Sequence, residues 1–270
     1  MAASAKGEYQ KALSYLTSAG VVTAADAIHA LAALHPHAEV PQLPQADLPV
    51  SAPFTAQNIQ DSLASFNKGT AAGPSGLRVQ HLADVISVNP DLAETLSRWC
   101  TRVANADVPR DVECFLAAAR LIPLRKKPTG IRPVAVGETL RRLVGKLVLA
   151  RAAPTCRNIL ERHRQMGGSP GGLDMAIHTI GQAARNLGPD EVEIKVDWTN
   201  AFNCIDRALA LRLCRELVPE LSRYAELLYG KSAPALFVHN SLTVLRSCQG
   251  TQQGDPLASI LFCLALFLEQ

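Results

Sequence analysis

The chain has 270 residues, of which 48% are hydrophobic and 19% are charged. This composition suits a globular protein with a sizeable core and excludes a mainly disordered one. The net charge is only +3, but residues 118–170 hold 12 basic and 2 acidic residues, whereas the segments on either side are net acidic. Such a basic block is typical of a surface that binds phosphate groups, although a solvated basic face has the same composition.

Seven cysteines are widely spaced, with no Cys-x-x-Cys pair and no Cys/His pair at metal-site spacing. We interpret them as reduced core thiols of an intracellular protein. The N-terminus lacks a secretory apolar segment, and the longest apolar run, 256–268, is too short to cross a bilayer. We therefore expect no membrane role, and the sequence does not distinguish nucleus from cytoplasm.

The first third of the chain is predicted to be helical, interrupted by a proline-rich stretch. Apolar periodicity and breaker residues predict an irregular linker over 35–53 and helices over 6–19, 23–34, 55–66, 91–106 and 110–117. Within this region, glycines surround Pro74 in KGTAAGPSGLRVQHL and predict a tight turn, with a helix beginning at Ser75. The turn suits close approach to another backbone or to a nucleic-acid strand, and a purely structural turn uses the same residues.

A basic hairpin is predicted over 118–136. Two apolar runs flank RKKPTG, whose Pro-Thr-Gly tip supplies the turn. Its cations, at the tip and on the returning strand, are Arg125, Lys126, Lys127 and Arg132. Forked guanidinium donors and mobile ammonium groups suit a triphosphate, although edge strands also carry lysine simply to prevent aggregation.

The basic surface is predicted to continue along a helix over 138–151. Its apolar stripe leaves Arg141, Arg142 and Lys146 facing outward. We expect the surface formed by 120–164 to bind RNA in a salt-sensitive manner, because phosphate contacts release counterions. The following glycine-rich loop, 167–172, lacks the Gly-Lys-Ser/Thr ending of a P-loop and precedes a helix over 173–184.

A single carboxylate, Asp197, ends the next predicted element. Val192, Ile194 and Val196 alternate with charged residues, which predicts a half-buried strand with Asp197 on the opposite face. Helical spacing then resumes over 201–217. An acidic residue at a strand end can meet a ligand, and a helix cap is the alternative interpretation.

The C-terminal region combines a short hairpin with a polar loop and an apolar helix. The runs 235–238 and 242–245 predict the hairpin. In SCQGTQQGDPLASILFCLALFL, Asp255 is a predicted helix cap and Pro256 takes the first helical position. The helix that follows is apolar on every side, which places it centrally in the fold.

Three segments in fixed order, IRPVAVGETLRRLVGK, VDWTNAFNCIDR and GTQQGDPLASILF, resemble the reverse transcriptase domain of non-LTR retrotransposons. KGTAAGPSGL is similar to an additional N-terminal motif of that branch, and the resemblance covers about 55–270. It implies an α+β right-hand polymerase fold, helix-rich, with fingers, a partial palm and a small incomplete antiparallel sheet that bears Asp197. The implied divisions are an N-terminal extension over 1–54, a fingers-like region over 55–190 and a partial palm over 191–270.

The implied activity is that of an RNA-directed DNA polymerase, which adds dNTPs to a primer 3′-hydroxyl on an RNA template, with a DNA primer and two Mg²⁺ ions. Asp197 matches the first catalytic aspartate and metal ligand, assisted by the backbone carbonyl of Trp198. Phe202 matches the aromatic gate beneath the sugar. The remaining nucleotide-binding residues implied are Lys126 (with Arg125 or Lys127 as alternatives), Arg132, Gln253 and Gly254. Nucleic-acid contacts are implied for Arg125, Lys127, Arg141, Arg142, Lys146, Gly73 and Gly76.

The chain departs from this family at its catalytic carboxylates. Relatives supply two more from a Phe/Tyr-x-Asp-Asp hairpin after the apolar helix, and these 270 residues contain no Asp-Asp pair. Asp206 and Asp255 are poor substitutes, since one is expected in a helix and the other as a cap. We therefore expect a polymerase fragment that does not extend a primer. The alternatives are a catalytically dead nucleic-acid-binding remnant, or an unrelated helical scaffold in which Asp197, Arg132, Phe202 and Gln253 do not converge.

Overall fold

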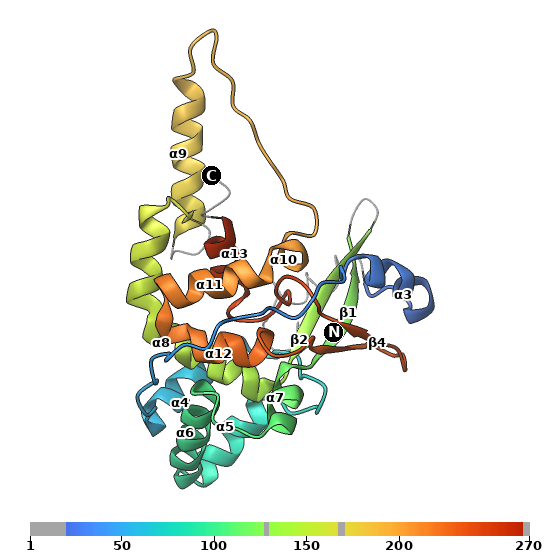
Figure 1. Ribbon diagram of the computed structural model, residues 1–270, viewed down its shortest axis with the longest axis vertical. Helices are drawn as coiled ribbons and strands as arrows, with labels where there is room; N and C mark the ends of the chain where they lie inside the picture. Colours follow the sequence, from blue (N-terminus) through green and yellow to red (C-terminus); the bar gives the residue numbers. More distant parts are fainter. Residues whose placement is uncertain (1–19, 127–129, 167–170, 267–270) are drawn as a thin grey trace, which may run out of the picture.

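The computed structural model describes residues 20–126, 130–166 and 171–266 (Figure 1). This part of the chain is helix-rich with one small mixed sheet, which agrees with the α+β class predicted. The expected helix over 6–19 and the tip residues 127–129 lie outside the described residues. The helices are α3 (Ala24–Ala33), α4 (Ala56–Ala64), α5 (Val79–Val88), α6 (Asp91–Ala104), α7 (Arg110–Ala117), α8 (Thr139–Arg162), α9 (Gly172–Arg185), α10 (Ala201–Cys204), α11 (Arg207–Leu217), α12 (Pro219–Tyr229) and α13 (Ala258–Leu266).

The predicted basic hairpin is confirmed as strands β1 (Ala119–Arg125) and β2 (Ile131–Gly137), which pair antiparallel. The short C-terminal hairpin is also confirmed, as β3 (Ala235–Val238) and β4 (Val244–Arg246). The two hairpins form one sheet in the order β2-β1-β3-β4 because β1 and β3 pair in parallel. The expectation of an antiparallel sheet is therefore wrong in this respect: the sheet is mixed.

The predicted strand ending at Asp197 is not formed. The chain between α9 and α10 is extended but has no ladder partner, and Figure 1 shows it returning from the far end of α9. Val192 and Ile194 are each 79% exposed and Val196 is 69% exposed. Alternation creates an apolar face, but a strand also needs a neighbour that satisfies its backbone groups. No described strand lies beside this segment, so the sheet does not bear Asp197.

Several helix boundaries also differ from the predictions: α8 continues to Arg162, beyond the predicted end at 151, and α13 begins at Ala258 and not at Pro256. Ser75 lies in a turn, and the helix begins four residues later, at Val79. The single helix predicted over 201–217 is broken, because Asp206 caps α11 by accepting a hydrogen bond from the backbone N–H of Leu209 (3.0 Å). This cap turns the chain between α10 and α11, so that Phe202 sits on a separate short helix.

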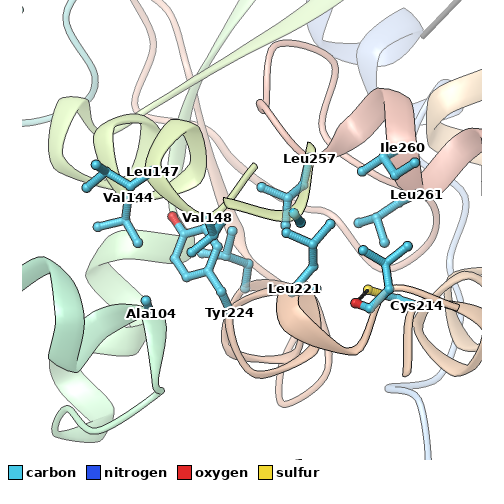
Figure 2. Close-up of a cluster of buried hydrophobic side chains, with 14 of the residues drawn as sticks. Ala104, Val144, Leu147, Val148, Cys214, Leu221, Tyr224, Leu257, Ile260 and Leu261 are labelled. Carbon is cyan, nitrogen blue, oxygen red and sulfur yellow. Dashed lines mark hydrogen bonds between the residues drawn. The ribbon is translucent and has the colours of Figure 1, made fainter. Parts of the chain in front are cut away.

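The long helix α8 runs through the main core. Figure 2 shows Val144, Leu147 and Val148 of α8 beside Tyr224 of α12, with Leu257 next to Leu221. All six side chains are buried. The apolar helix α13 contributes Ile260 and Leu261 to the same cluster, as its sequence predicted. Burial of these aliphatic groups contributes roughly 1.5–3 kcal/mol per fully buried side chain.

A second, smaller core joins α3 to the sheet. Ala27 and Leu31 of α3 pack with Leu121 of β1, Ala135 of β2 and Leu236 of β3. The sheet is held further by an isolated antiparallel bridge between Val21 and Leu124. Helix α3 thereby covers the hairpin that carries the predicted phosphate-binding cations.

The proline-rich stretch 35–53 has no regular secondary structure, as predicted, but three arginines anchor it. Arg215 donates to the carbonyl of Pro44 (2.7 Å), and Arg223 donates to that of Leu48. Arg151 of α8 donates to the carbonyl of Ala52. Charge-assisted bonds to carbonyls satisfy a segment that has no ladder of its own.

All seven cysteines are free, and four of them, Cys100, Cys156, Cys214 and Cys263, are buried. Burial raises the pKa of Cys100 to about 12 and that of Cys156 to about 11. Cys114 and Cys204 are exposed, so the expectation that the cysteines are core thiols is wrong for these two. Among the helices of the described segments, none is both long and apolar enough to cross a membrane.

Candidate functional site

A pocket of about 250 Å³ lies between the basic hairpin, α10 and the loop that precedes α13. Its lining includes five of the residues selected from the sequence: Lys126, Arg132, Trp198, Phe202 and Gln253. The segments that supply them are far apart in the sequence: Phe202 lies 70 residues after Arg132, and Gln253 lies 51 residues after Phe202. The unrelated-scaffold hypothesis predicts that Asp197, Arg132, Phe202 and Gln253 do not converge; Arg132, Phe202 and Gln253 line this pocket together, whereas Asp197 does not line it.

The hairpin supplies the positive charge of the pocket. Leu124 lies opposite Arg132 in the β1–β2 register, and the alternation of the pleat puts Lys126 on the same side. The backbone N–H of Lys126 donates to the carbonyl of Gly130 (2.9 Å), which closes the hairpin next to the pocket. Lys126 and Arg132 are both exposed and are the charged residues in the lining. The pocket therefore favours an anion.

The short helix α10 supplies the opposite wall. It begins after Asn200, whose φ of 56° is left-handed, a conformation that asparagine adopts more readily than most residues. The Asn200 amide donates to the carbonyl of Leu34 (2.7 Å) and thereby ties α10 to the end of α3. Phe202 packs on Phe262 of α13, with ring centroids 5.2 Å apart. These contacts fix the aromatic ring at the pocket wall.

The loop before α13 forms hydrogen bonds with both the hairpin strand β2 and the helix α10. The carbonyl of Gln253 accepts a hydrogen bond from the backbone N–H of Ala135 in β2 (2.8 Å), and the N–H of Thr251 donates to the carbonyl of Phe202 (2.7 Å). Gly254 has φ +114°, and a Cβ there would lie 2.7 Å from the Ala135 carbonyl oxygen. Gly254 is therefore required for the close contact with β2 and is not itself part of the lining.

A buried arginine holds the start of this loop. The Arg207 guanidinium donates to the carbonyls of Gly250 (2.7 Å), Ser247 (2.8 Å) and Gln249 (2.9 Å). Burial lowers the pKa of Arg207 to about 10, which still leaves the side chain charged at neutral pH. Its guanidinium lies over the Tyr229 ring, 5.3 Å from the centroid.

Arg141 is buried rather than outward-facing, which corrects the prediction made from the helical stripe. It is paired with the buried carboxylate of Asp255, and it donates to Gln252 Oε1 (2.7 Å) and to the hydroxyl of Tyr229 (3.0 Å). Burial disfavours its charge, but Asp255 and two tyrosines outweigh that cost and raise the pKa of Arg141 further. Arg141 therefore supports the loop from inside the protein and has no surface available for nucleic acid.

Arg142 is also buried, so its predicted outward orientation is wrong as well. It donates to the carbonyl of Ala71 (2.6 Å) in the segment that precedes the Gly73 turn. A Cβ on Gly73 would lie 2.6 Å from the Cα of Glu138, so the close backbone approach predicted at this turn is made to the protein itself. The Glu138 carboxylate accepts from the backbone N–H (2.7 Å) and hydroxyl (2.6 Å) of Ser75.

The remaining described residues predicted to contact nucleic acid do not line the pocket and lie at different places in the fold. Gly76 has φ +80°, and a Cβ there would have no atom within 4 Å, which fits a turn residue in open space. Arg125 ends β1 and is exposed, but it does not line the pocket. Lys146 is half-buried and donates to the Ser65 hydroxyl (3.0 Å). Lys127 lies outside the described residues.

Asp197 precedes Trp198, which lines the pocket, but Asp197 itself is not part of the lining. Its carboxylate is exposed. Asp206 caps α11, and Asp255 accepts from the backbone N–H of Leu257 (2.7 Å) in the turn that precedes α13. In the described part of the chain, no three His, Cys, Asp or Glu side chains lie together as metal ligands. These residues alone do not complete the magnesium site implied by the resemblance.

Sequence reasoning missed the residues that hold the pocket together. Arg207 and Gln252 lie within the selected motifs, but their sequence positions did not indicate a role for them. Tyr229 lies in α12, outside every motif, and its hydroxyl accepts from Arg141 and from the backbone N–H of Gln252 (3.3 Å). For Asn200, the turn preference of asparagine was a usable signal, whereas nothing local identifies Tyr229.

Comparison of the chain with known protein families found no matching family model, and comparison with curated proteins found no significant match. Its function is therefore inferred from the motifs and from the geometry of the pocket.

Proposed function

We propose that these residues form the fingers and part of the palm of a reverse transcriptase, an RNA-directed DNA polymerase that transfers nucleotides from dNTPs to a primer 3′-hydroxyl. The convergence of Lys126, Arg132, Phe202 and Gln253 in one pocket is the observation that carries the proposal. Two cations in a pocket without a lining carboxylate favour a triphosphate. A phenylalanine anchored by ring packing suits a flat contact with the sugar.

In this proposal the protein binds and orients the incoming nucleotide from three directions. Arg132 and Lys126 bind the phosphates, Phe202 lies under the sugar, and Gln253 with its loop borders the base and template. Asp197 is the residue assigned to Mg²⁺, and RNA template and DNA primer are the partners. The substrate would enter from the open side, where Trp198 is 58% exposed.

Nucleotide binding can be measured directly by tryptophan fluorescence. The chain has two tryptophans, so a Trp99→Phe background leaves Trp198 as a reporter in the pocket wall. We expect dNTP to change its emission, and Arg132→Ala and Lys126→Ala each to weaken binding by about 10-fold or more, since hydrogen bonds to charged groups contribute about 1.5–3 kcal/mol.

Arg125→Ala is the matched control, because it removes a neighbouring cation of the same hairpin that does not line the pocket. Its affinity is expected to stay within about twofold of the parent value, because the loss of a surface charge away from the ligand changes the free energy by less than about 0.5 kcal/mol. A dNTP affinity that is equal in the Arg132, Lys126 and Arg125 variants would contradict the proposal.

A catalytically dead nucleic-acid-binding remnant is the second candidate, and the exposed Asp197, which belongs to no cluster of three potential metal ligands among the described residues, favours it. Primer extension on an RNA template, with dNTPs and Mg²⁺, addresses the activity of these 270 residues. We expect no extension, since one carboxylate does not hold two metal ions. Extension that disappears in Asp197→Asn would contradict this expectation and would establish polymerase activity for this chain.

A further inference from the structure

A second cavity, of about 750 Å³, lies between α4, α5 and the segment that connects them. In Figure 1 these helices lie at the opposite end of the molecule from α9. Leu63, Phe66 and Ile86 contribute apolar surface to the groove. Gln60, Asn67 and Gln80 add side-chain amides at its rim. The groove shares no lining residue with the pocket at α10.

The charged residues that line this groove are all basic. Lys68 and Arg78 are the charged residues in its lining. The single acidic residues of α4 and α5, Asp61 and Asp84, do not line it and instead accept hydrogen bonds from Gln57 and Gln80 on their own helices. Since α5 begins within the groove, the positive end of its helix dipole also lies there.

A third cation, Lys146, lies next to the groove because it packs on the ring of Phe66, which lines the groove. The Lys146 ammonium lies 4.8 Å from the centroid of the Phe66 ring and donates to the Ser65 hydroxyl. The amide rim, the ring of Phe66 and the cations thus surround one cavity. A nucleobase has two apolar faces and a polar edge, and its backbone carries the phosphate, so each part of a nucleotide has a complementary surface here.

We propose that this groove binds one unpaired nucleotide of a single nucleic-acid strand, with its base against Phe66 and its phosphate at Lys68 and Arg78. A duplex does not fit this role, because its bases are stacked inside and only its backbone is accessible. The site is independent of the nucleotide pocket proposed above, and it places a strand contact outside the basic hairpin.

The test uses the full chain and a fluorescein-labelled 12-nucleotide single-stranded RNA, with binding followed by anisotropy. Two variants alter the groove in different ways: Arg78→Gln removes a charge, and Ala83→Phe fills space between the helices. Each is expected to weaken binding about 10-fold, the scale of one stacked base or one phosphate contact. Arg78→Gln should also reduce the slope of log affinity against log salt by about 0.7.

Arg98→Gln is the matched control, since Arg98 is exposed on the neighbouring helix α6 and bonds there to Thr95. It should change the affinity by less than about twofold. Photo-crosslinking with 4-thiouridine RNA should label residues between 60 and 90. Unchanged RNA affinity in both groove variants, equal competition by a 12-base-pair duplex or by polyglutamate, or crosslinks confined to other segments would each overturn the proposal.

The two proposals fail separately. If Trp198 fluorescence does not respond to dNTP, the proposed nucleotide pocket is contradicted, while the RNA affinity measured by anisotropy is unaffected. If Arg78→Gln does not weaken RNA binding, the proposed groove site is contradicted, while dNTP binding is unaffected. Circular dichroism melting of Arg78→Gln and Ala83→Phe identifies any variant that is not folded, and the charge variant lies on the surface, where substitutions rarely affect folding.

Discussion

Replacing Arg141 with methionine is expected to lower the free energy of unfolding by about 3–5 kcal/mol. The substitution would leave the Asp255 carboxylate buried, with 1% of its side chain exposed, and without its counter-charge. It would also remove the donor to Gln252 and Tyr229. Leaving one charge buried without its partner costs more free energy than the intact pair contributes to stability. Urea unfolding followed by circular dichroism measures the change.

The neighbouring Arg142 offers the control for this prediction. Arg142→Met removes a buried arginine that bonds to Ala71 and Thr139; the Glu138 carboxylate favours its charge without the direct ion pair that Arg141 makes with Asp255. It is expected to cost about 1–3 kcal/mol, mainly through lost hydrogen bonds, because the nearby Glu138 carboxylate keeps the two hydrogen bonds that it accepts from Ser75. The double variant Arg141→Met, Asp255→Asn should recover part of the stability of the single variant. An Arg141→Met loss no larger than that of Arg142→Met would contradict the assignment.

Replacing Gly250 with alanine is the second substitution with a large expected effect. The position has φ +61°, and a Cβ there would lie 2.2 Å from the Phe202 carbonyl oxygen and 2.4 Å from the carbonyl carbon of Asn203. The loop must therefore separate from α10, which breaks the Thr251 hydrogen bond to Phe202. Strain and overpacking together are expected to cost about 3 kcal/mol or more.

This substitution should also alter the nucleotide pocket, because the displaced segments carry Phe202 and Gln253. Gly76→Ala separates the cost of backbone strain from that of overpacking, since Gly76 has a similar φ of +80° but open space around its Cβ position. It should lose only about 1–2 kcal/mol, the penalty of a left-handed backbone. Thermal melting and the Trp198 titration of both variants are the measurements. Equal losses at Gly250 and Gly76 would show that the contact with α10 is not tight.

Local patterns predicted those elements whose stabilising contacts are close in sequence. The β1–β2 hairpin followed from two apolar runs around RKKPTG, since strands so close in the sequence readily pair with each other. Asp255 accepts from the backbone N–H of Leu257, the local bond expected near a helix start, although α13 itself begins three residues later, at Ala258, and not at Pro256. Five of the selected site residues also line one pocket, which their motifs alone did not require.

Predictions that depended on distant partners were wrong. The segment 192–196 has the alternation of a strand, but no strand of the described residues pairs with it, and its apolar side chains are exposed. Arg141 lies off the apolar stripe of α8, yet a carboxylate from a loop far along the chain, Asp255, meets it in the interior. Periodicity describes one helix, and it does not describe what packs against the other side of that helix.

The amino-acid sequence by itself determined the hairpin, the helices of the core, the concentration of charge in 118–170 and the three motifs. Only the tertiary structure decided which of the basic residues reach solvent: Lys126 and Arg132 remain exposed, whereas Arg141, Arg142 and Arg207 are held by internal hydrogen bonds. The physical reason is that a charge is accommodated wherever acceptors surround it, and those acceptors come from loops that are remote in the sequence.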